Sequence, residues 1–176
     1  MRAVLLVLAL AACGTDPRLA PFPMRLQISA GEYPEHAQAI QALADEVNAR
    51  IGCAAVTLTD AKSYFRIHWS NHYEMTEHFP MIKHYGGLGT IEDLTKPNGL
   101  YDEPLAQIIW LDTQADPKGI ALIWLHFLAY QAGVPDNTND PYSIGYNHPT
   151  WAEDPVGALF AGLGGEAAAR TKLCQL

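Results

Sequence analysis

The sequence predicts one α/β (α+β) domain, with a mixed, twisted sheet of about five strands, a buried central helix and a C-terminal helix. Short runs of β-branched and aromatic residues are interspersed with two strong helical patterns. One pattern, over Pro34–Ile51, is apolar along a single stripe, and the other, over Ile120–Leu128, is apolar on nearly all sides. With 176 residues, 49% of them hydrophobic, the chain can build one sizeable core.

The first strand is predicted at Arg25–Ser29, where apolar and polar residues alternate. The next element is the amphipathic helix, because Pro34 suits a first helical turn and Gly52 ends the apolar stripe. Four further strands are expected from their β-branched and aromatic residues, the third of them weakly, as an edge strand: Ala54–Thr59, Tyr64–Trp69, Gly86–Ile91 and Gln107–Leu111.

Between these strands, Asn71–Tyr85 is predicted to be a loop rich in histidine and aromatic residues. Asp116 and Pro117 fit the N-cap and first position of the central helix. After a long loop over Val134–Pro155, one last helix is expected over Pro155–Leu173, weakened by four glycines.

Residues 1–12 are predicted to be a signal peptide, because their apolar run of about ten residues is shorter than the roughly 20 that span a bilayer. Leu10-Ala11-Ala12-Cys13 resembles the lipobox of bacterial lipoproteins, which implies cleavage before Cys13 and lipidation of that residue. Residues 13–24 would then be a linker, and 25–176 the domain. Gly14 is typical of sorting to the outer membrane of the cell envelope, whereas an ordinary secretory signal is the alternative.

The mature chain is acidic. Without Arg2 it keeps ten basic residues against 19 acidic ones, a formal charge of −9, which argues against nucleic-acid binding. Cys53 and Cys174 remain as a pair that can form a disulfide in an oxidising compartment. Such a bond closes a loop of about 120 residues and stabilises the fold by on the order of 4–5 kcal/mol. Two buried free thiols are the alternative.

One motif suggests a function. His126, Tyr130, Gly133 and Asp136 form the pattern HFxxYxxGxxD, and Ser143-Ile144-Gly145-Tyr146 follows it. The pattern resembles the metzincin zinc peptidases, in their matrixin-like branch, where HExxHxxGxxH or HExxHxxGxxD precedes an S-I-M-Y turn. The resemblance covers Leu26 to Leu173, with the specific part between Leu122 and Tyr146.

The resemblance implies a zinc site, but its reactive positions are changed. His126 and Asp136 keep two ligand positions. Tyr130 takes the second position, where a phenol must lose a proton before it binds metal. Phe127 replaces the glutamate base, and Gly145 replaces the methionine beneath the metal. These changes predict a pseudoenzyme without zinc.

Three readings remain open. In the first, the old cleft between Gly86–Ile91 and the loop from Asp136 to His148 binds a protein or peptide partner. In the second, the chain is an active zinc-dependent endopeptidase with the ligands His126, Asp136 and His148, and Glu153 or Asp154 as its acid. In the third, the chain is a structural lipoprotein with no site at all. The motif itself can also be a coincidence, with His126 and Tyr130 as a buried, hydrogen-bonded pair in an unrelated α/β domain, because a lone histidine on an apolar helix is more often a core residue than a ligand.

Overall fold

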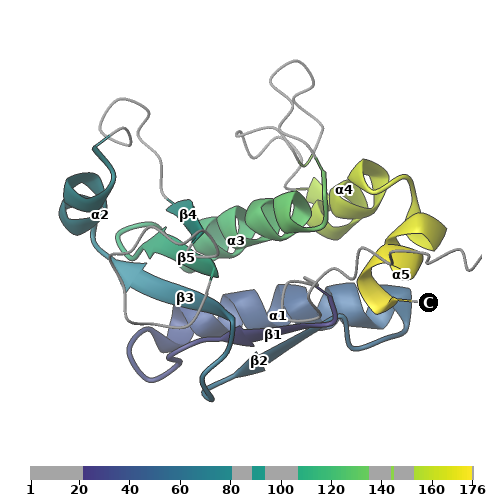
Figure 1. The fold of residues 1–176 in the computed structure, drawn as a ribbon, viewed down its shortest axis with the longest axis horizontal. Coiled ribbons are helices and arrows are strands. Elements are labelled where there is room, and N and C mark those ends of the chain that lie inside the picture. The colour runs from purple at the N-terminus through teal and green to yellow at the C-terminus, as the bar shows by residue number, and fades with distance from the viewer. Residues whose placement is uncertain (1–21, 81–88, 94–106, 135–143, 145–152, 176) are drawn as a thin grey trace, which may run out of the picture.

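The computed structural model of the chain describes residues 22–80, 89–93, 107–134, 144 and 153–175. Their order is β1, α1, β2, β3, α2, β4, β5, α3, α4 and α5 (Figure 1), which confirms the mixed α/β class. The predicted signal peptide and the lipidation site Cys13 lie outside the described residues. Within them, no helix combines the length and the apolar character that crossing a bilayer requires.

The sheet has five strands in the order β2-β1-β3-β5-β4. Neighbouring strands are parallel except for β4, which runs antiparallel to β5 at one edge. The strands begin and end within three residues of the predicted positions, the largest shift being at the start of β4: β1 is Met24–Gln27, β2 is Val56–Thr59, β3 is Phe65–Ser70, β4 is Gly89–Asp93 and β5 is Gln107–Asp112.

Two long helices, α1 (Pro34–Ile51) and α3 (Pro117–Gln131), pack against each other and against the sheet. Alternate strand residues, such as Ile67 and Ile109, are buried beneath them in one hydrophobic core. Helix α1 begins with Pro34 and ends at Gly52, whose φ of 73° is left-handed, as the sequence predicts. Asp116 is the N-cap of α3, and its side chain accepts a hydrogen bond from the Gly119 N–H at 2.9 Å.

The C-terminal segment departs from the prediction of one helix over Pro155–Leu173. It forms α4 (Pro155–Gly162) and α5 (Glu166–Cys174). The break falls at Gly164 and Gly165, whose φ values of 94° and 100° lie outside the helical region. The predicted disulfide between Cys53 and Cys174 is confirmed, and it joins the end of α1 to the end of α5.

The predicted loop over Asn71–Tyr85 is also wrong in part, because His72–His78 form the helix α2. The side chain of Asn71 accepts a hydrogen bond from the Glu74 N–H at 2.9 Å and thereby caps this helix. An asparagine three residues before a glutamate is similar to a helix-capping box, so the sequence held a signal for α2.

Candidate functional site

The candidate site lies on the exposed side of α3, beside strand β4. His126 and Tyr130 are four residues apart in this helix, so they share one face about 5–6 Å apart. His126 is partly buried, whereas Tyr130 is 55% exposed. The helix therefore presents an imidazole and a phenol side by side, as the motif predicts.

The ring of His126 has a defined orientation. Its Nδ1 atom lies 2.7 Å from the backbone carbonyl oxygen of Ile144, which can only accept a hydrogen bond. Nδ1 therefore carries the proton, and Nε2 keeps a lone pair. No residue in the described part of the chain hydrogen-bonds to Nε2. A histidine held through one nitrogen by a backbone carbonyl is suited to bind a metal or a hydrogen-bond donor through the other.

Helix α3 ends in a sharp reversal at Gly133, which has a φ of 85°. The Gly133 N–H donates to Tyr130 O and the Val134 N–H donates to Ala129 O, both at 2.9 Å, which is the pattern of a Schellman motif. The backbone thus turns directly after the His126 and Tyr130 face. Asp136, the predicted third ligand, follows three residues after Gly133 in the sequence and lies outside the described segments.

Ile144, from the predicted S-I-x-Y turn, is fully buried between α3 and α4. Gly162 of α4 makes this packing possible. A Cβ atom on Gly162 would lie 2.7 Å from Cγ2 of Ile144 and 3.2 Å from Cγ1 of Val134, which is too close. Helix α4 therefore holds Ile144 at the position from which its carbonyl reaches His126.

Phe127, at the position where the metzincin motif has a glutamate base, faces the edge strand. A Cβ atom on Gly89 would lie 2.9 Å from Cε2 of Phe127 and 2.8 Å from Cγ2 of Ile123, so β4 approaches the helix closely at this glycine. The centroids of the Phe127 and His126 rings are 5.5 Å apart. An apolar ring thus fills the space between helix and strand, and it offers no group that accepts a proton.

The structure brings together only part of the predicted site. His126, Phe127 and Tyr130 lie on α3, and the backbone of Ile144 contacts His126. Gly145, His148 and the first half of the predicted edge strand Gly86–Ile91 lie outside the described residues. Within the part that is described, no three His, Cys, Asp or Glu side chains are placed to hold a metal ion. The residues described here supply one nitrogen ligand, so no chemical step through zinc can be derived from them.

The two acids suggested for catalysis differ in their surroundings. Glu153 is exposed. Asp154 is the N-cap of α4, where it accepts a hydrogen bond from the Gly157 N–H at 2.9 Å and one from Arg50 at 2.8 Å. The bond from Gly157 and, second, the bond from Arg50 lower the pKa of Asp154. A lowered pKa does not favour the role of general acid, and the suggestion of Asp154 stays a prediction.

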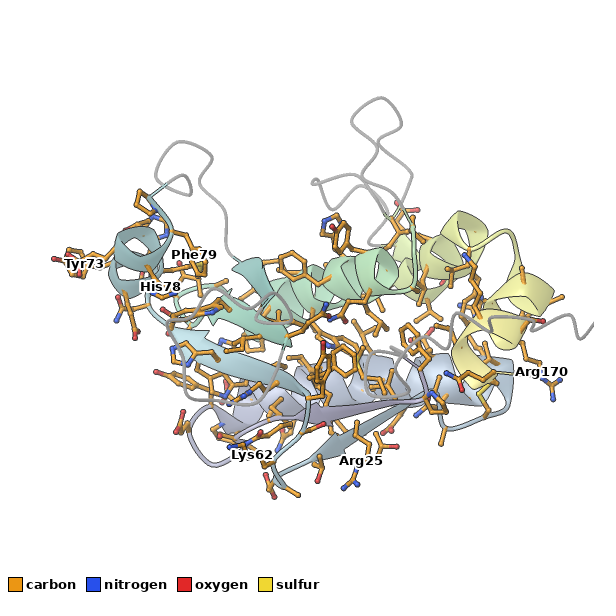
Figure 2. All side chains as sticks on the ribbon, in the orientation of Figure 1. Arg25, Lys62, Tyr73, His78, Phe79 and Arg170 are labelled. Carbon is orange, nitrogen blue, oxygen red and sulfur yellow. A yellow bond between two sulfur atoms is a disulfide. The ribbon has the colours of Figure 1, made fainter. Side chains whose placement is uncertain are left out.

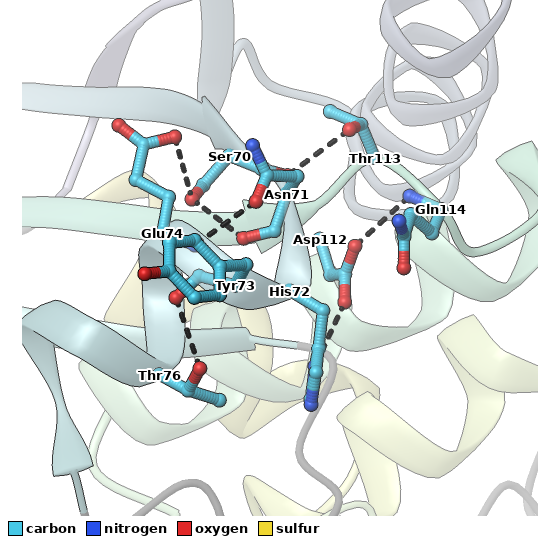
Figure 3. A network of polar contacts seen from close by, with 9 residues as sticks. All are labelled: Ser70, Asn71, His72, Tyr73, Glu74, Thr76, Asp112, Thr113 and Gln114. Carbon is cyan, nitrogen blue, oxygen red and sulfur yellow. Dashed lines mark hydrogen bonds and ion pairs between the residues drawn. The ribbon is translucent and has the colours of Figure 1, made fainter.

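A polar network that no sequence pattern indicated lies where β3 and β5 end (Figure 3). Asp112 is 1% exposed, and its carboxylate accepts a hydrogen bond from the Gln114 N–H at 2.9 Å. Its other oxygen lies 3.1 Å from Nδ1 of His72. The sequence offered one signal for this network, which is the aspartate Asp112 at the end of an apolar strand.

A crevice of about 290 Å³ lies elsewhere, at the carboxyl ends of β1 and β2 beside the start of α1.

Comparisons with protein-family models, with curated proteins and with solved structures found no match to this chain.

Proposed function

We propose that this chain is a lipid-anchored, metzincin-like domain of the bacterial envelope that has lost peptidase activity and acts as a binding module. The observation that carries the proposal is the hydrogen bond between His126 and the carbonyl of Ile144. It joins the first ligand position of the motif to the S-I-x-Y turn, two segments 18 residues apart that the resemblance expects to lie together. The order of strands and helices and the reversal at Gly133 also support a metzincin-like fold.

The environment of Phe127 supports the loss of activity. Its ring packs against Gly89 of the edge strand, so a carboxylate would have to replace an apolar contact there. A general base commonly contributes about 10²–10⁴ to a hydrolysis rate, and phenylalanine contributes none of it.

Strand β4 offers a way to bind a partner. It pairs with β5 along one edge, and no other strand that the structure describes pairs with its second edge. An extended peptide can add to such an edge through backbone hydrogen bonds. The lipid on Cys13 would hold this binding surface at the membrane.

The alternative is an active zinc-dependent endopeptidase with unusual ligands. It is favoured by the lone pair on Nε2 of His126, because Nδ1 is held by a backbone carbonyl as in many metal-binding histidines. Asp136 and His148 would complete that ligand set.

Metal analysis of the chain expressed from residue 14 onward, dialysed against zinc, separates the two functions. The binding-module proposal expects no tightly held zinc and no cleavage of an unfolded protein substrate. One zinc per chain that is lost in His126→Ala, together with zinc-dependent cleavage, would overturn it and support the endopeptidase.

A double substitution tests the metzincin-like scaffold itself. Phe127→Glu with Tyr130→His restores the residues of an active motif, and we expect the folded variant to bind zinc. Phe127→Gln with Tyr130→His is the matched control, which should bind zinc without hydrolysing peptides. Circular dichroism establishes that both variants fold. Absence of zinc binding in the two folded variants would contradict the family assignment.

A further inference from the structure

Strand β2 forms the edge of the sheet opposite β4, and its pairing with β1 shows which of its backbone groups point outward. The Ile28 N–H, directly after β1, donates to Thr59 O at 3.0 Å, so the backbone groups of Thr59 face β1. These groups alternate in direction from one residue to the next along a strand. The N–H and C=O groups of Val56 and Leu58 therefore point away from β1.

The side-chain amide of Asn48, on α1, occupies the first of these two outward positions. It donates to Val56 O at 2.7 Å and accepts from the Val56 N–H at 3.0 Å. This two-way exchange is the pattern of a hydrogen-bonded pair between antiparallel strands. The next such pair along β2 falls at Leu58, whose N–H and C=O have no hydrogen-bond partner among the described residues. Asn48 thus begins a row of backbone pairs that has an open second position.

A crevice between β2 and α1, the one of about 290 Å³ described above, lies beside this open position. Ile28, Ala37 and Leu58 give it an apolar floor, and Gln41 and Asp60 belong to its polar rim. Ile28 and Ala37 are buried, whereas Leu58 is only partly buried, so the crevice leaves apolar surface of this leucine open. Its volume is close to the lower end of ligand pockets, about 300 Å³, which suits one or two side chains.

The charge beside the crevice is negative. Asp60 is exposed at the rim, and Asp45 accepts a hydrogen bond from the rim residue Gln41 at 2.8 Å. The closest arginine and lysine in the sequence, Arg25 and Lys62, do not line the crevice. Figure 2 shows both at the lower side of the molecule, with Arg25 pointing away from α1. An occupant that carries a positive side chain next to an apolar one is therefore complementary to this surface.

We propose that the crevice binds a short extended peptide segment of a partner protein, which adds antiparallel to β2. One residue of the peptide exchanges two backbone hydrogen bonds with Leu58 and places an apolar side chain in the crevice. Directly opposite residues point to the same face of a sheet, so the peptide residue two positions earlier, opposite Asp60, is a lysine or an arginine. The crevice lies at the opposite edge from β4, so its use does not depend on the proposed function.

A second copy of β2 does not fit this edge. If Leu58 paired with Leu58 of another copy in antiparallel fashion, Asp60 of each chain would lie opposite Val56 of the other. The outward groups of Val56 are already bonded to Asn48, so that position is occupied. A short peptide avoids the conflict because it can turn outward after the residue opposite Leu58.

An NMR titration of the chain from residue 14 onward with a capped pentapeptide tests the proposal. The probe is acetyl-Thr-Lys-Thr-Val-Thr-amide, which places its valine opposite Leu58 and its lysine opposite Asp60. Few hydrogen bonds hold the complex, so we expect a dissociation constant on the order of 0.1–1 mM. The backbone amide signals of Leu58 and Asp60 should move most, and that of Glu166, on α5, should not move.

Two N-methylated probes test the backbone pairing itself. A methyl group on the valine nitrogen removes the donor to Leu58 O and leaves that carbonyl covered without a partner, so the affinity should fall at least about tenfold. The matched control carries the methyl group on the threonine before the valine, whose N–H points away from β2. Its affinity should fall by less than about threefold, because no hydrogen bond to β2 is lost.

A substitution in the protein tests the preference for a positive side chain. Asp60→Asn should weaken binding of the unmethylated probe about twofold to fivefold, the usual effect of an exposed ion pair. Glu166→Gln, at the far end of the fold, is the matched control and should bind like the wild type. An unmoved Leu58 signal at about 5 mM probe, or equal losses from the two N-methylated probes, would overturn the proposal. Leu58 shifts that follow the protein concentration without probe would also overturn it, because they would assign this edge to a second copy.

Discussion

The side-chain amide of Asn48 hydrogen-bonds both backbone groups of Val56. Its Nδ2 donates to the Val56 carbonyl at 2.7 Å, and its Oδ1 accepts from the Val56 N–H at 3.0 Å. Val56 begins β2, the edge strand at the far side of the sheet from β4. Asn48 therefore occupies the place of a residue from a neighbouring strand and blocks further pairing there.

Replacing this amide should destabilise the fold. Asn48→Ala removes two hydrogen bonds and leaves two partly buried backbone groups without partners, so we expect the free energy of unfolding to fall by about 2–3 kcal/mol. Urea denaturation measures this change. Gln38→Ala, on the exposed side of the same helix, is the control and should change it by less than about 0.5 kcal/mol. Equal effects of the two substitutions would contradict the strand-like role of Asn48.

The close contact between Gly162 and Ile144 gives a second prediction. Gly162→Ala places a methyl group 2.7 Å from Cγ2 of Ile144, and the resulting strain should cost about 1–3 kcal/mol despite the better helix propensity of alanine. Gly31→Ala is a suitable control, since its added Cβ meets nothing within 4 Å. The imidazole NMR signals of His126 should shift in Gly162→Ala only. If Gly162→Ala leaves both the His126 signals and the stability unchanged, Ile144 can move to make room for the added methyl group.

The pKa of Asp154 predicts a dependence of stability on pH. Because the bonds from Gly157 and Arg50 lower this pKa, the stabilisation is present above the ordinary aspartate value of 3.8 and is lost as the pH falls through the lower folded-state value. Asp154→Asn keeps a capping oxygen but loses the charge. At neutral pH the free energy of unfolding of Asp154→Asn should be lower than that of the wild type by less than about 1 kcal/mol, because the Asp154 side chain is 62% exposed.

The comparison is made by thermal unfolding between about pH 6 and pH 2.5, a range that spans the titration of aspartates. The stabilities of the wild type and Asp154→Asn should become equal at the acid end of this range. A deficit that stays constant over this range would mean that the charge of Asp154 does not contribute.

The disulfide gives the largest expected effect on stability. Cys53 and Cys174 are 121 residues apart, and replacing both with serine should lower the free energy of unfolding by about 4–5 kcal/mol, the chain-entropy estimate for such a loop. Wild-type protein with and without a reducing agent provides the comparison. A loss below about 1 kcal/mol would mean that the reduced chain keeps α5 in place by packing alone.

Local signals were sufficient to predict α1 and α3. Pro34, Gly52 and one apolar stripe define α1 without knowledge of the rest of the fold, and Asp116 with Pro117 defines the start of α3. The sequence also contained the break between α4 and α5 as Gly164 and Gly165, but only backbone dihedrals show that both leave the helical region.

Long-range contacts could not be predicted in this way. His72 and Asp112 are 40 residues apart, and their meeting requires the register that pairs Ser70 with Asp112 across β3 and β5. The Asn71 cap is a local signal for α2, but no pattern within seven residues indicates that Met75 of this helix is buried. The approach of Ile144 to His126 was suggested by the family resemblance and not by local propensity.

The bridge between Cys53 and Cys174 also changes how the chain withstands proteolysis. Every peptide bond between these two residues lies within a covalent ring, so one cut in that span opens the ring without releasing a fragment. The two pieces stay attached until a reductant acts, and the nicked molecule would migrate as one species on a non-reducing gel and as two on a reducing gel. A singly cleaved molecule therefore stays in one piece for as long as the disulfide is intact.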